Sequence, residues 1–411
     1  MLFGILPKKK NDIRVIQHSN LQISIPFRIK VILSAQYFMI FGVMGVTLPY
    51  FNLYCYHMHL SGIEIGTLNA SRSFLIIVFG IVWGILADHY QRRRLIYIVC
   101  QLLGAFACAF YLKADHYMSI LCVTIIVAIF YAPLISFMEA FTMDLIGDNK
   151  HAYGSIRLWG SIQFIVMVLL VGELLNYFSY RLIIEIIVAG FFVQALVSLF
   201  IPKSKKVVRA DNKPIFFIFK KARVVVYLIT TFLMLLSHGT YYAFSSIHLE
   251  QLGAGSNAIA IFWALGTISE IFVMINSRRI FSRFQVETVL IFSCGMAVIR
   301  WMIMFYTTSV IIAILSQLLH AATYGAYHVG GIIYIDQCMP ESTKTIGQSV
   351  NNAVSYGLGL MTGSYISCYL FEMVGTHNAF IFSAITAAIS GISLLSYYSI
   401  TKRKTCEKAI Q

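Results

Sequence analysis

The sequence predicts an all-α membrane protein built from two groups of six membrane-spanning helices. The chain has 411 residues, of which 59% are hydrophobic and only 12% are charged. Soluble domains carry about 25% charged residues, so this composition is typical of a polytopic membrane protein. The apolar residues form runs long enough to cross a bilayer, and the basic residues gather in alternate connections between these runs.

The apolar runs give the predicted helices. A hydrocarbon core about 30 Å thick needs roughly 20 apolar residues for each crossing. Twelve runs meet this length, at residues 31–56, 65–87, 95–113, 117–140, 153–176, 181–201, 224–249, 257–276, 287–307, 309–335, 344–371 and 377–400.

The basic residues predict the orientation of the chain. Of its 31 Lys and Arg residues, 26 fall in the two termini and in alternate loops. Lys113 and Arg181 fall in the other loops, and Arg72, Arg157 and Arg300 lie within apolar runs. An excess of basic residues marks cytoplasmic loops, which predicts that both termini are cytoplasmic. The net charge of +14 therefore reports topology, and we expect no nucleic-acid partner.

One basic stretch divides the chain. Residues 202–223 hold eight basic residues and two prolines. We therefore predict five parts: a basic cytoplasmic leader, a six-helix bundle, a cytoplasmic linker, a second six-helix bundle and a cytoplasmic tail. Their bounds are 1–30, 31–201, 202–223, 224–400 and 401–411. Paired bundles of this kind rock around a site near the middle of the membrane in many transporters.

The segment WGILADHYQRRR, at residues 83–94, resembles the loop between the second and third helices of the major facilitator superfamily, although two of its positions depart from that pattern. The resemblance implies a loop that controls conformation, formed by Gly84, Asp88, Arg92 and Arg93. We expect Gly84 to permit close helix approach, and Asp88 to bond N–H groups at the helix end. The arginines would anchor the loop at the cytoplasmic face.

Several blocks extend the resemblance over nearly the whole chain. They are LPYFNLY at 48–54, YGSIRLWGS at 153–161, WALGTISEI at 263–271 and QLLHAATYGAYH at 317–328. These blocks resemble the phenylpropionic acid permease family, which is related to the lactose permease group of oligosaccharide–proton symporters. The lactose permease pattern implies solute binding by Glu139 and Arg157. It also implies a polar cluster for solute binding and proton coupling, formed by Glu270, Arg300 and His320.

Glu139 ends one apolar run and Arg157 begins the next, both nearer the cytoplasmic end than the midplane. A charge in hydrocarbon costs about 2.5–3.5 kcal/mol, so charges kept there are usually paired or functional. The pair could contact the solute through the planar guanidinium, or could form a gate or packing salt bridge. Sequence alone leaves both interpretations open.

Glu270 is the leading candidate for the proton carrier. The coupling carboxylate that the lactose permease pattern places three residues after the histidine is Thr323 here. A buried carboxylate near an arginine can exist charged or neutral, and a histidine titrates near neutral pH. Alternatively, Arg300 only neutralises Glu270, and His320 is a hydrogen-bonded core histidine.

Aromatic residues complete the predicted substrate site. Trp159 and Trp263 each lie in one of the blocks beside a charged residue, and Tyr324 lies in the fourth block. Such rings could stack on a sugar or an aromatic solute, although Tyr and Trp are also common at membrane interfaces. Arg72 either faces the cavity or pairs with an acid.

The sequence contains no pattern typical of an enzyme. Its eight cysteines are scattered and form no CxxC, which argues against a metal site. It has no nucleophile motif, nucleotide-binding loop or HExxH motif, and residues 1–30 lack the pattern of a signal peptide. We therefore expect no catalytic residues, no metal and no cofactor.

These observations predict a secondary active transporter in the bacterial cytoplasmic (inner) membrane. It would move a small organic solute, either an aromatic carboxylate or a sugar-like molecule, by alternating access. We expect proton symport driven by the proton gradient, with a monomer whose partners are the solute, protons and the lipid bilayer. The alternatives are a uniporter or exchanger of the same fold, and a membrane receptor or scaffold that does not transport. The lack of a sizeable extramembrane domain argues against a receptor.

Overall fold

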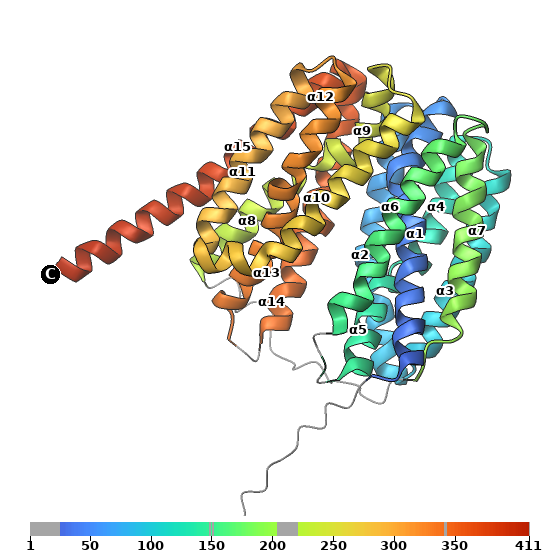
Figure 1. Cartoon of the computed structure of the whole chain (residues 1–411), viewed down its shortest axis with the longest axis horizontal. Coiled ribbons are helices and arrows are strands. Elements are labelled where there is room, and N and C mark those ends of the chain that lie inside the picture. The colour runs from blue at the N-terminus through green and yellow to red at the C-terminus, as the bar shows by residue number, and fades with distance from the viewer. Residues whose placement is uncertain (1–24, 148, 150–151, 204–220, 341–342, 411) are drawn as a thin grey trace, which may run out of the picture.

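The computed structural model describes residues 25–410 except 148, 150–151, 204–220 and 341–342. Its helices form two groups, one from each half of the chain (Figure 1). Residues 1–24 of the expected leader and most of the expected linker at 202–223 lie outside the described residues. The two groups correspond to the two bundles expected at 31–201 and 224–400.

The first group follows the expected spans closely. Its helices are α1 (Phe27–His57), α2 (Gly62–Tyr90), α3 (Arg93–Ala109), α4 (Tyr117–Tyr131), α5 (Leu134–Ile146), α6 (Ala152–Leu174) and α7 (Arg181–Ser198). A 3₁₀ turn at Phe110–Lys113 extends α3. The span expected at 117–140 contains both α4 and α5, with Pro133 between them. Proline lacks the N–H that would continue the helical ladder, which explains the break.

The second group contains more irregular helices. Its α-helices are α8 (Ala222–Ser237), α9 (Gly239–Gln251), α10 (Ser256–Arg283), α11 (Val286–Tyr306), α12 (Val310–Leu315), α13 (Tyr327–Cys338), α14 (Lys344–Asn352) and α15 (Leu360–Ile410). A 3₁₀ turn at Ser316–Leu319 and a π-helical turn at Ala321–Ala326 join α12 to α13. A second π-helical turn, at Ala353–Gly359, joins α14 to α15. Such π turns occur frequently at functional sites.

Eleven helical stretches of the described chain are long and apolar enough to cross a membrane. Ten of them correspond to one expected span each. The last, Ile346–Thr401, has 56 residues and contains the spans expected at 344–371 and 377–400. Within it, Gly375 has φ +80° and ψ 170°, which is not helical. The helix α15 continues beyond residue 400 to Ile410, through most of the stretch expected as the cytoplasmic tail.

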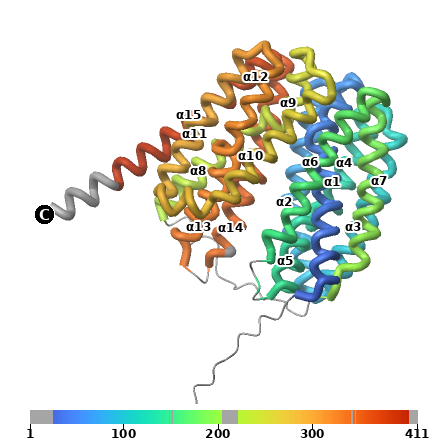
Figure 2. Tube along the Cα trace, viewed as in Figure 1, coloured from blue at the N-terminus to red at the C-terminus, as the bar shows by residue number. Residues whose placement is uncertain are grey.

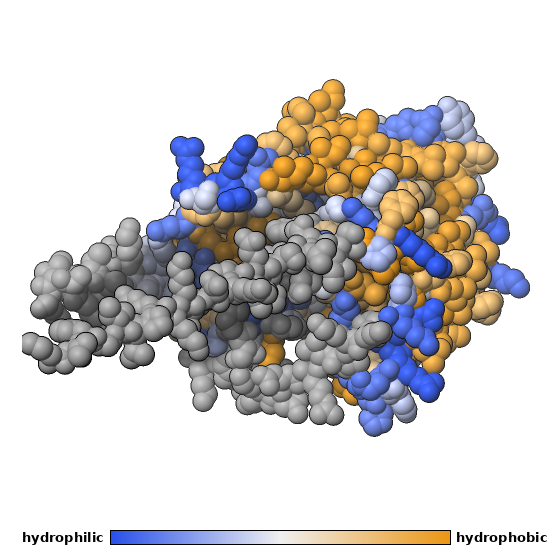
Figure 3. Space-filling model, turned by 60° about the horizontal axis from the view of Figure 1, so that its bottom comes forward, coloured by the Kyte–Doolittle hydropathy of each residue, from blue (hydrophilic) through white to orange (hydrophobic). Residues whose placement is uncertain are grey.

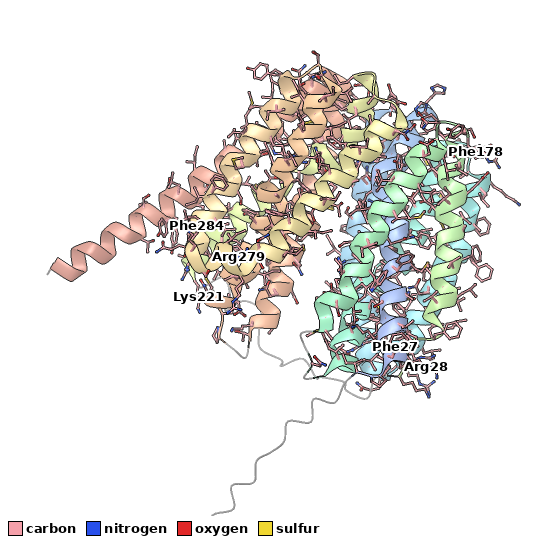
Figure 4. All side chains as sticks on the ribbon, viewed as in Figure 1. Phe27, Arg28, Phe178, Lys221, Arg279 and Phe284 are labelled. Carbon is pink, nitrogen blue, oxygen red and sulfur yellow. The ribbon has the colours of Figure 1, made fainter. Side chains whose placement is uncertain are left out.

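The two ends of the helices differ in charge. Arg28, Lys221 and Arg279 lie at one end, and Phe178 lies at the other (Figure 4). We call these the basic end and the far end. Figure 3 shows hydrophobic side chains over the sides of the molecule and hydrophilic ones gathered toward the basic end. This separation agrees with the charge pattern that the sequence predicts.

The two groups meet at the far end, where α9 and α10 approach α1 and α6 (Figure 2). His57 Nε2 lies 2.8 Å from Glu250 Oε1, and the Tyr180 hydroxyl donates to the same oxygen at 2.8 Å. The rings of His57 and Tyr180 stack with centroids 3.6 Å apart. Glu250 of the second group is therefore held by two side chains of the first.

Three further hydrogen bonds join the groups. Asn257 Nδ2 donates to Glu173 Oε2 at 2.7 Å, Asn52 Nδ2 donates to the Ala243 carbonyl at 2.9 Å, and the Gly62 N–H donates to the Glu372 carboxylate. These hydrogen bonds, like those to Glu250, lie toward the far end. The largest apolar core includes both groups, whereas the second core cluster belongs to the first group alone. The hydrogen bonds between the groups therefore gather toward the far end, while apolar packing between α2 and the turn at Ala353–Gly359 continues below it.

Gly172 supports this connection by allowing α6 to approach α10. A Cβ at this position would lie 2.4 Å from Ala260 Cβ and 3.0 Å from the Ser256 carbonyl oxygen. We predict that Gly172→Ala separates the groups at the far end. Spin labels at Phe178 and Tyr306, in a background without native cysteines, should then report a longer mean distance by pulsed EPR. Gly84→Ala is the control, because its Cβ would meet nothing within 4 Å. An unchanged distance in Gly172→Ala would contradict the packing argument.

Candidate functional site

Three residues that lie far apart in sequence form a hydrogen-bonded chain in the second group. Glu270 lies on α10, Arg300 on α11 and His320 at the end of the 3₁₀ turn. His320 Nε2 is 2.7 Å from Glu270 Oε1, and Arg300 Nη1 is 2.6 Å from His320 Nδ1. The structure therefore brings together the three residues that the sequence predicts for proton coupling.

The geometry fixes the protonation of His320. A guanidinium can only donate hydrogen bonds, so Nδ1 of His320 accepts the bond from Arg300. The ring proton is then on Nε2 and is donated to Glu270. A second ring proton would place an N–H against the guanidinium N–H. In this arrangement His320 is neutral, and Glu270 is the acceptor at the end of the chain.

Arg300 is held by further acceptors. It is fully buried, Nη2 donates to Gln317 Oε1 at 2.7 Å, and Nη1 donates to Thr323 Oγ1 at 3.1 Å. Its guanidinium lies 4.4 Å from the ring centroid of Tyr241, and only Nε has no partner. Thr323, which stands where the lactose permease pattern has a carboxylate, thus binds the arginine directly.

The irregular turns explain how these side chains converge. Gln317, His320 and Thr323 are spaced by three residues, and all reach Arg300. In a regular α-helix, residues 317 and 323 would point about 120° apart. In a 3₁₀ turn, residues three apart lie on one face, and the π turn that follows changes the phase again. Gly325 also allows α10 to pack closely, since its Cβ would lie 3.4 Å from Glu270 Cα.

The first group contributes Arg157 at the start of α6. Its guanidinium lies 3.7 Å from the ring centroid of Phe41 and 5.6 Å from that of Tyr37, both on α1. Arg157 also interacts electrostatically with Glu270 of the second group. Charged residues from both groups therefore act on the same carboxylate.

Glu139 is placed less closely. It lies on α5 with an exposed side chain and interacts electrostatically with Arg157. No ion pair within 4.0 Å joins the two in the part of the chain described here. The interpretation of this pair as a contact salt bridge therefore does not hold in this arrangement.

The three predicted aromatic residues have different environments. Tyr324 is half-buried and stacks on His320, with centroids 5.1 Å apart. Trp263 is buried behind the cluster, its ring 5.0 Å from Tyr241 and its N–H donating to Ser246 Oγ at 2.9 Å. Trp159 is 48% exposed. It follows Arg157 by two residues, so it points about 200° around the helix from it. The structure does not bring Trp159 to the cluster.

Sequence reasoning missed Gln317, which links Tyr241 to Arg300. The Tyr241 hydroxyl donates to Gln317 Oε1 at 3.2 Å, so this amide oxygen accepts from both Tyr241 and Arg300. A usable signal was the position of Gln317, three residues before His320 in the fourth block. Across the described residues, no group of three or more His, Cys, Asp or Glu could hold a metal ion.

The loop motif is anchored mainly by its arginines. Arg93 pairs with Asp144 at 3.2 Å, Arg94 donates to the main chain near the end of α7, and Arg92 is exposed at the start of α3. The expectation for Gly84 is wrong, because open space surrounds it. The Asp88 carboxylate makes none of the expected bonds to N–H groups within the described chain. Instead its main-chain carbonyl accepts from Gln91 Nε2 at 2.5 Å.

Comparison with known families matches residues 30–382 to the model of the MFS_1 like family. The chain belongs to the MFS_1 like family. This result confirms the resemblance to major facilitator superfamily transporters, and the fold agrees with it. The crystal structure of the nucleoside transporter NupG superimposes with a TM-score of 0.80 at 18% identity. The match covers 91% of this chain and 99% of that one.

Relatives of this MFS_1 like protein are named as transporters and permeases. The probable 3-phenylpropionic acid transporter of Escherichia coli is 25% identical over 361 residues, covering 86% of this chain and 94% of the relative. The maltose permease of Geobacillus stearothermophilus is 20% identical over 368 residues, covering 87% and 92%. None of these names denotes an enzyme, in keeping with the expectation from the sequence.

We predict that Thr323→Val destabilises the protein. The change keeps the volume but removes one acceptor from the buried Arg300, and losing such a hydrogen bond costs about 1–3 kcal/mol. Thermal unfolding of the purified protein should begin at a lower temperature. Thr386→Val is the matched control, because that hydroxyl bonds only to carbonyls of its own helix. Equal melting temperatures for the two variants would show that Thr323 does not support Arg300.

Proposed function

We propose that this protein is a secondary active transporter that moves a small organic solute by alternating access, with proton symport. The observation that carries the proposal is the chain Glu270–His320–Arg300 within membrane-spanning helices, in electrostatic reach of Arg157 from the other group. Intramembrane ionisable groups that face the interior of a bundle mark solute or proton paths.

The position of the carboxylate fits this role. Glu270 lies midway along the 28-residue helix α10, and its side chain is 20% exposed while its neighbour His320 is buried. A proton can therefore reach the carboxylate, while the histidine and arginine behind it stay fixed. The middle of the membrane is where alternating-access transporters place the solute and the coupling ion.

Protonation of Glu270 would change the force between the two groups. Ionised, the carboxylate attracts both Arg300 of its own group and Arg157 of the other. Neutral, it loses both attractions and keeps only the hydrogen bond to His320. One proton thus alters an interaction between the two groups of helices. A change between two conformations requires that one of them be stabilised more than the other, and this proton can do so.

The remaining features give a consistent topology. A helix of 51 residues spans about 75 Å, far more than a bilayer core, which supports a second crossing beyond Gly375. The proposed topology then has twelve crossings, with both termini and the basic end at the cytoplasmic face of a bacterial inner membrane. The far end, where the groups are joined, is then closed to the outside. The monomer forms the whole pathway, with the proton gradient as its energy source.

The solute class follows from the relatives and the site together. Guanidinium groups, stacked rings and one carboxylate suit either an aromatic carboxylate or a sugar-like solute. The relatives named for 3-phenylpropionic acid and maltose support each class in turn. Uniport and exchange differ from symport in their response to a pH gradient, which supplies the test.

We predict that Glu270→Gln abolishes solute accumulation driven by a pH gradient but retains exchange. The amide keeps the shape and the hydrogen bond to His320 but cannot carry a proton. The measurement is uptake of labelled solutes into proteoliposomes, with and without an imposed gradient, using 3-phenylpropionate, maltose and uridine.

Glu185→Gln is the control for this experiment. It also removes one carboxylate, but from the exposed face of α7, where Glu185 pairs with Arg181 at 3.7 Å. This variant should accumulate solute like the wild type. Accumulation by Glu270→Gln at the wild-type level would refute the role of Glu270. Wild-type entry that ignores the gradient would indicate a uniporter or exchanger, and no entry of any solute would favour a receptor or scaffold.

A further inference from the structure

A second charged side chain lies inside the first group, away from the Glu270 chain. Arg72 is on α2, ten residues after Gly62, which places it about 15 Å below the far end of that helix. It lines a cavity of about 160 Å³ between α1, α2, α4 and α7. The cavity therefore lies near the middle of the membrane and is distinct from the site described above.

Arg72 has no counter-ion in the described chain. No acidic side chain lies within ion-pair distance of it, and it makes no hydrogen bond there. The groups that act on its charge are Tyr131, Tyr111 and Cys55, which are neutral. A guanidinium at this depth costs about 2.5–3.5 kcal/mol. In the described chain, no acid and no hydrogen-bond acceptor offsets this cost.

The rest of the cavity wall is mostly apolar. Phe51, Phe191 and Ile76 line it. The hydroxyls of two lining threonines are already used within the chain: Thr47 donates to the Val43 carbonyl at 2.8 Å, and Thr124 donates to the Ile120 carbonyl at 2.7 Å. The Tyr111 hydroxyl bonds to Thr124 Oγ1 at 2.7 Å, and the hydroxyls of Ser73 and Tyr131 also belong to the wall. Arg72, with its fork of donors, is the charged residue in this lining.

From these features we infer that the cavity binds the carboxylate form of a single-ring aromatic acid, with Arg72 holding the carboxylate. Arginine pairs with carboxylates through two parallel hydrogen bonds, and such charge-assisted bonds are strong where water is excluded. An engineered apolar cavity of about 150 Å³ binds benzene, so the volume here suits one ring. The ring would lie against Phe51 and Phe191.

A sugar-like ligand fits this cavity poorly. Each buried hydroxyl without a partner costs about 1–3 kcal/mol. Besides Arg72, the wall offers the hydroxyls of Ser73 and Tyr131, which are too few for the several hydroxyls of a sugar. The inference rests on the proposed transport function and selects the aromatic carboxylate from its two solute classes. It assigns the recognition of the carboxylate to Arg72, whereas Glu270 carries the proton.

The test is binding to the purified full-length protein, measured by isothermal titration calorimetry. The probes are 3-phenylpropionate, its neutral amide and maltose. We expect the acid to bind at least tenfold more tightly than the amide, and maltose not to compete. Arg72→Gln should weaken binding of the acid at least tenfold, and Arg72→Lys should restore part of it. Arg279→Gln removes an exposed arginine at the basic end and should bind like the wild type.

A second variant protects the test against misfolding. Ile76→Trp fills the cavity and leaves Arg72 in place. It should also abolish binding of the acid, so that the acid no longer binds more tightly than its amide. Gel filtration and thermal unfolding identify variants that do not fold. If Arg72→Gln fails to fold, Arg72→Lys and Ile76→Trp decide the question.

The outcomes separate this inference from the proposed function. Wild-type affinity for the acid in Arg72→Gln or Ile76→Trp, or equal binding of acid and amide, would overturn the inference. Gradient-driven uptake of another solute would then leave the transporter intact. Conversely, binding that depends on Arg72, without gradient-driven uptake of any solute, would support the site and overturn proton symport.

Discussion

The buried guanidinium of Arg300 is the constraint on which the candidate site depends. An arginine side chain keeps its charge in proteins, so its surroundings must supply acceptors. Gln317, Thr323 and the neutral ring of His320 do so, and Tyr241 covers one face. Because Arg300 donates to one ring nitrogen, the other must carry the proton. The arginine thereby fixes the direction of every hydrogen bond between itself and Glu270.

The hydrogen bonds between the two groups of helices gather at the far end, and this arrangement bears on what the charge of Glu270 can do. The five hydrogen bonds that join the groups in the described part of the chain lie toward the far end, so a rotation about that end would keep them. Glu270 lies midway along α10 and interacts electrostatically with Arg157 of the other group. A change in one charge can therefore shift the balance between two packings, as a coupling free energy between distant sites requires.

The sequence predicted those features that follow from composition along a helix. Runs of apolar residues located the spans, the basic loops located the ends, and the family resemblance identified Glu270, Arg300 and His320. It could not predict features that depend on helix phase or on packing. The turns around Gln317 depart from α-helical geometry, and Trp159 points away from Arg157 because two residues span about 200° of rotation.

The three arginines within the membrane-spanning helices differ in the groups that stabilise their charge, and this difference suggests a different role for each. Arg300 has acceptors on both terminal nitrogens, so its charge is satisfied by the fold. Arg157 rests on the faces of two aromatic rings and interacts with Glu270, so its charge is stabilised partly by the other group. Arg72 has neither an acceptor nor an acid in the described chain and faces an apolar cavity. A fold that keeps an unsatisfied guanidinium there gains stability when an anion enters, which is the property expected of a binding site rather than of a scaffold.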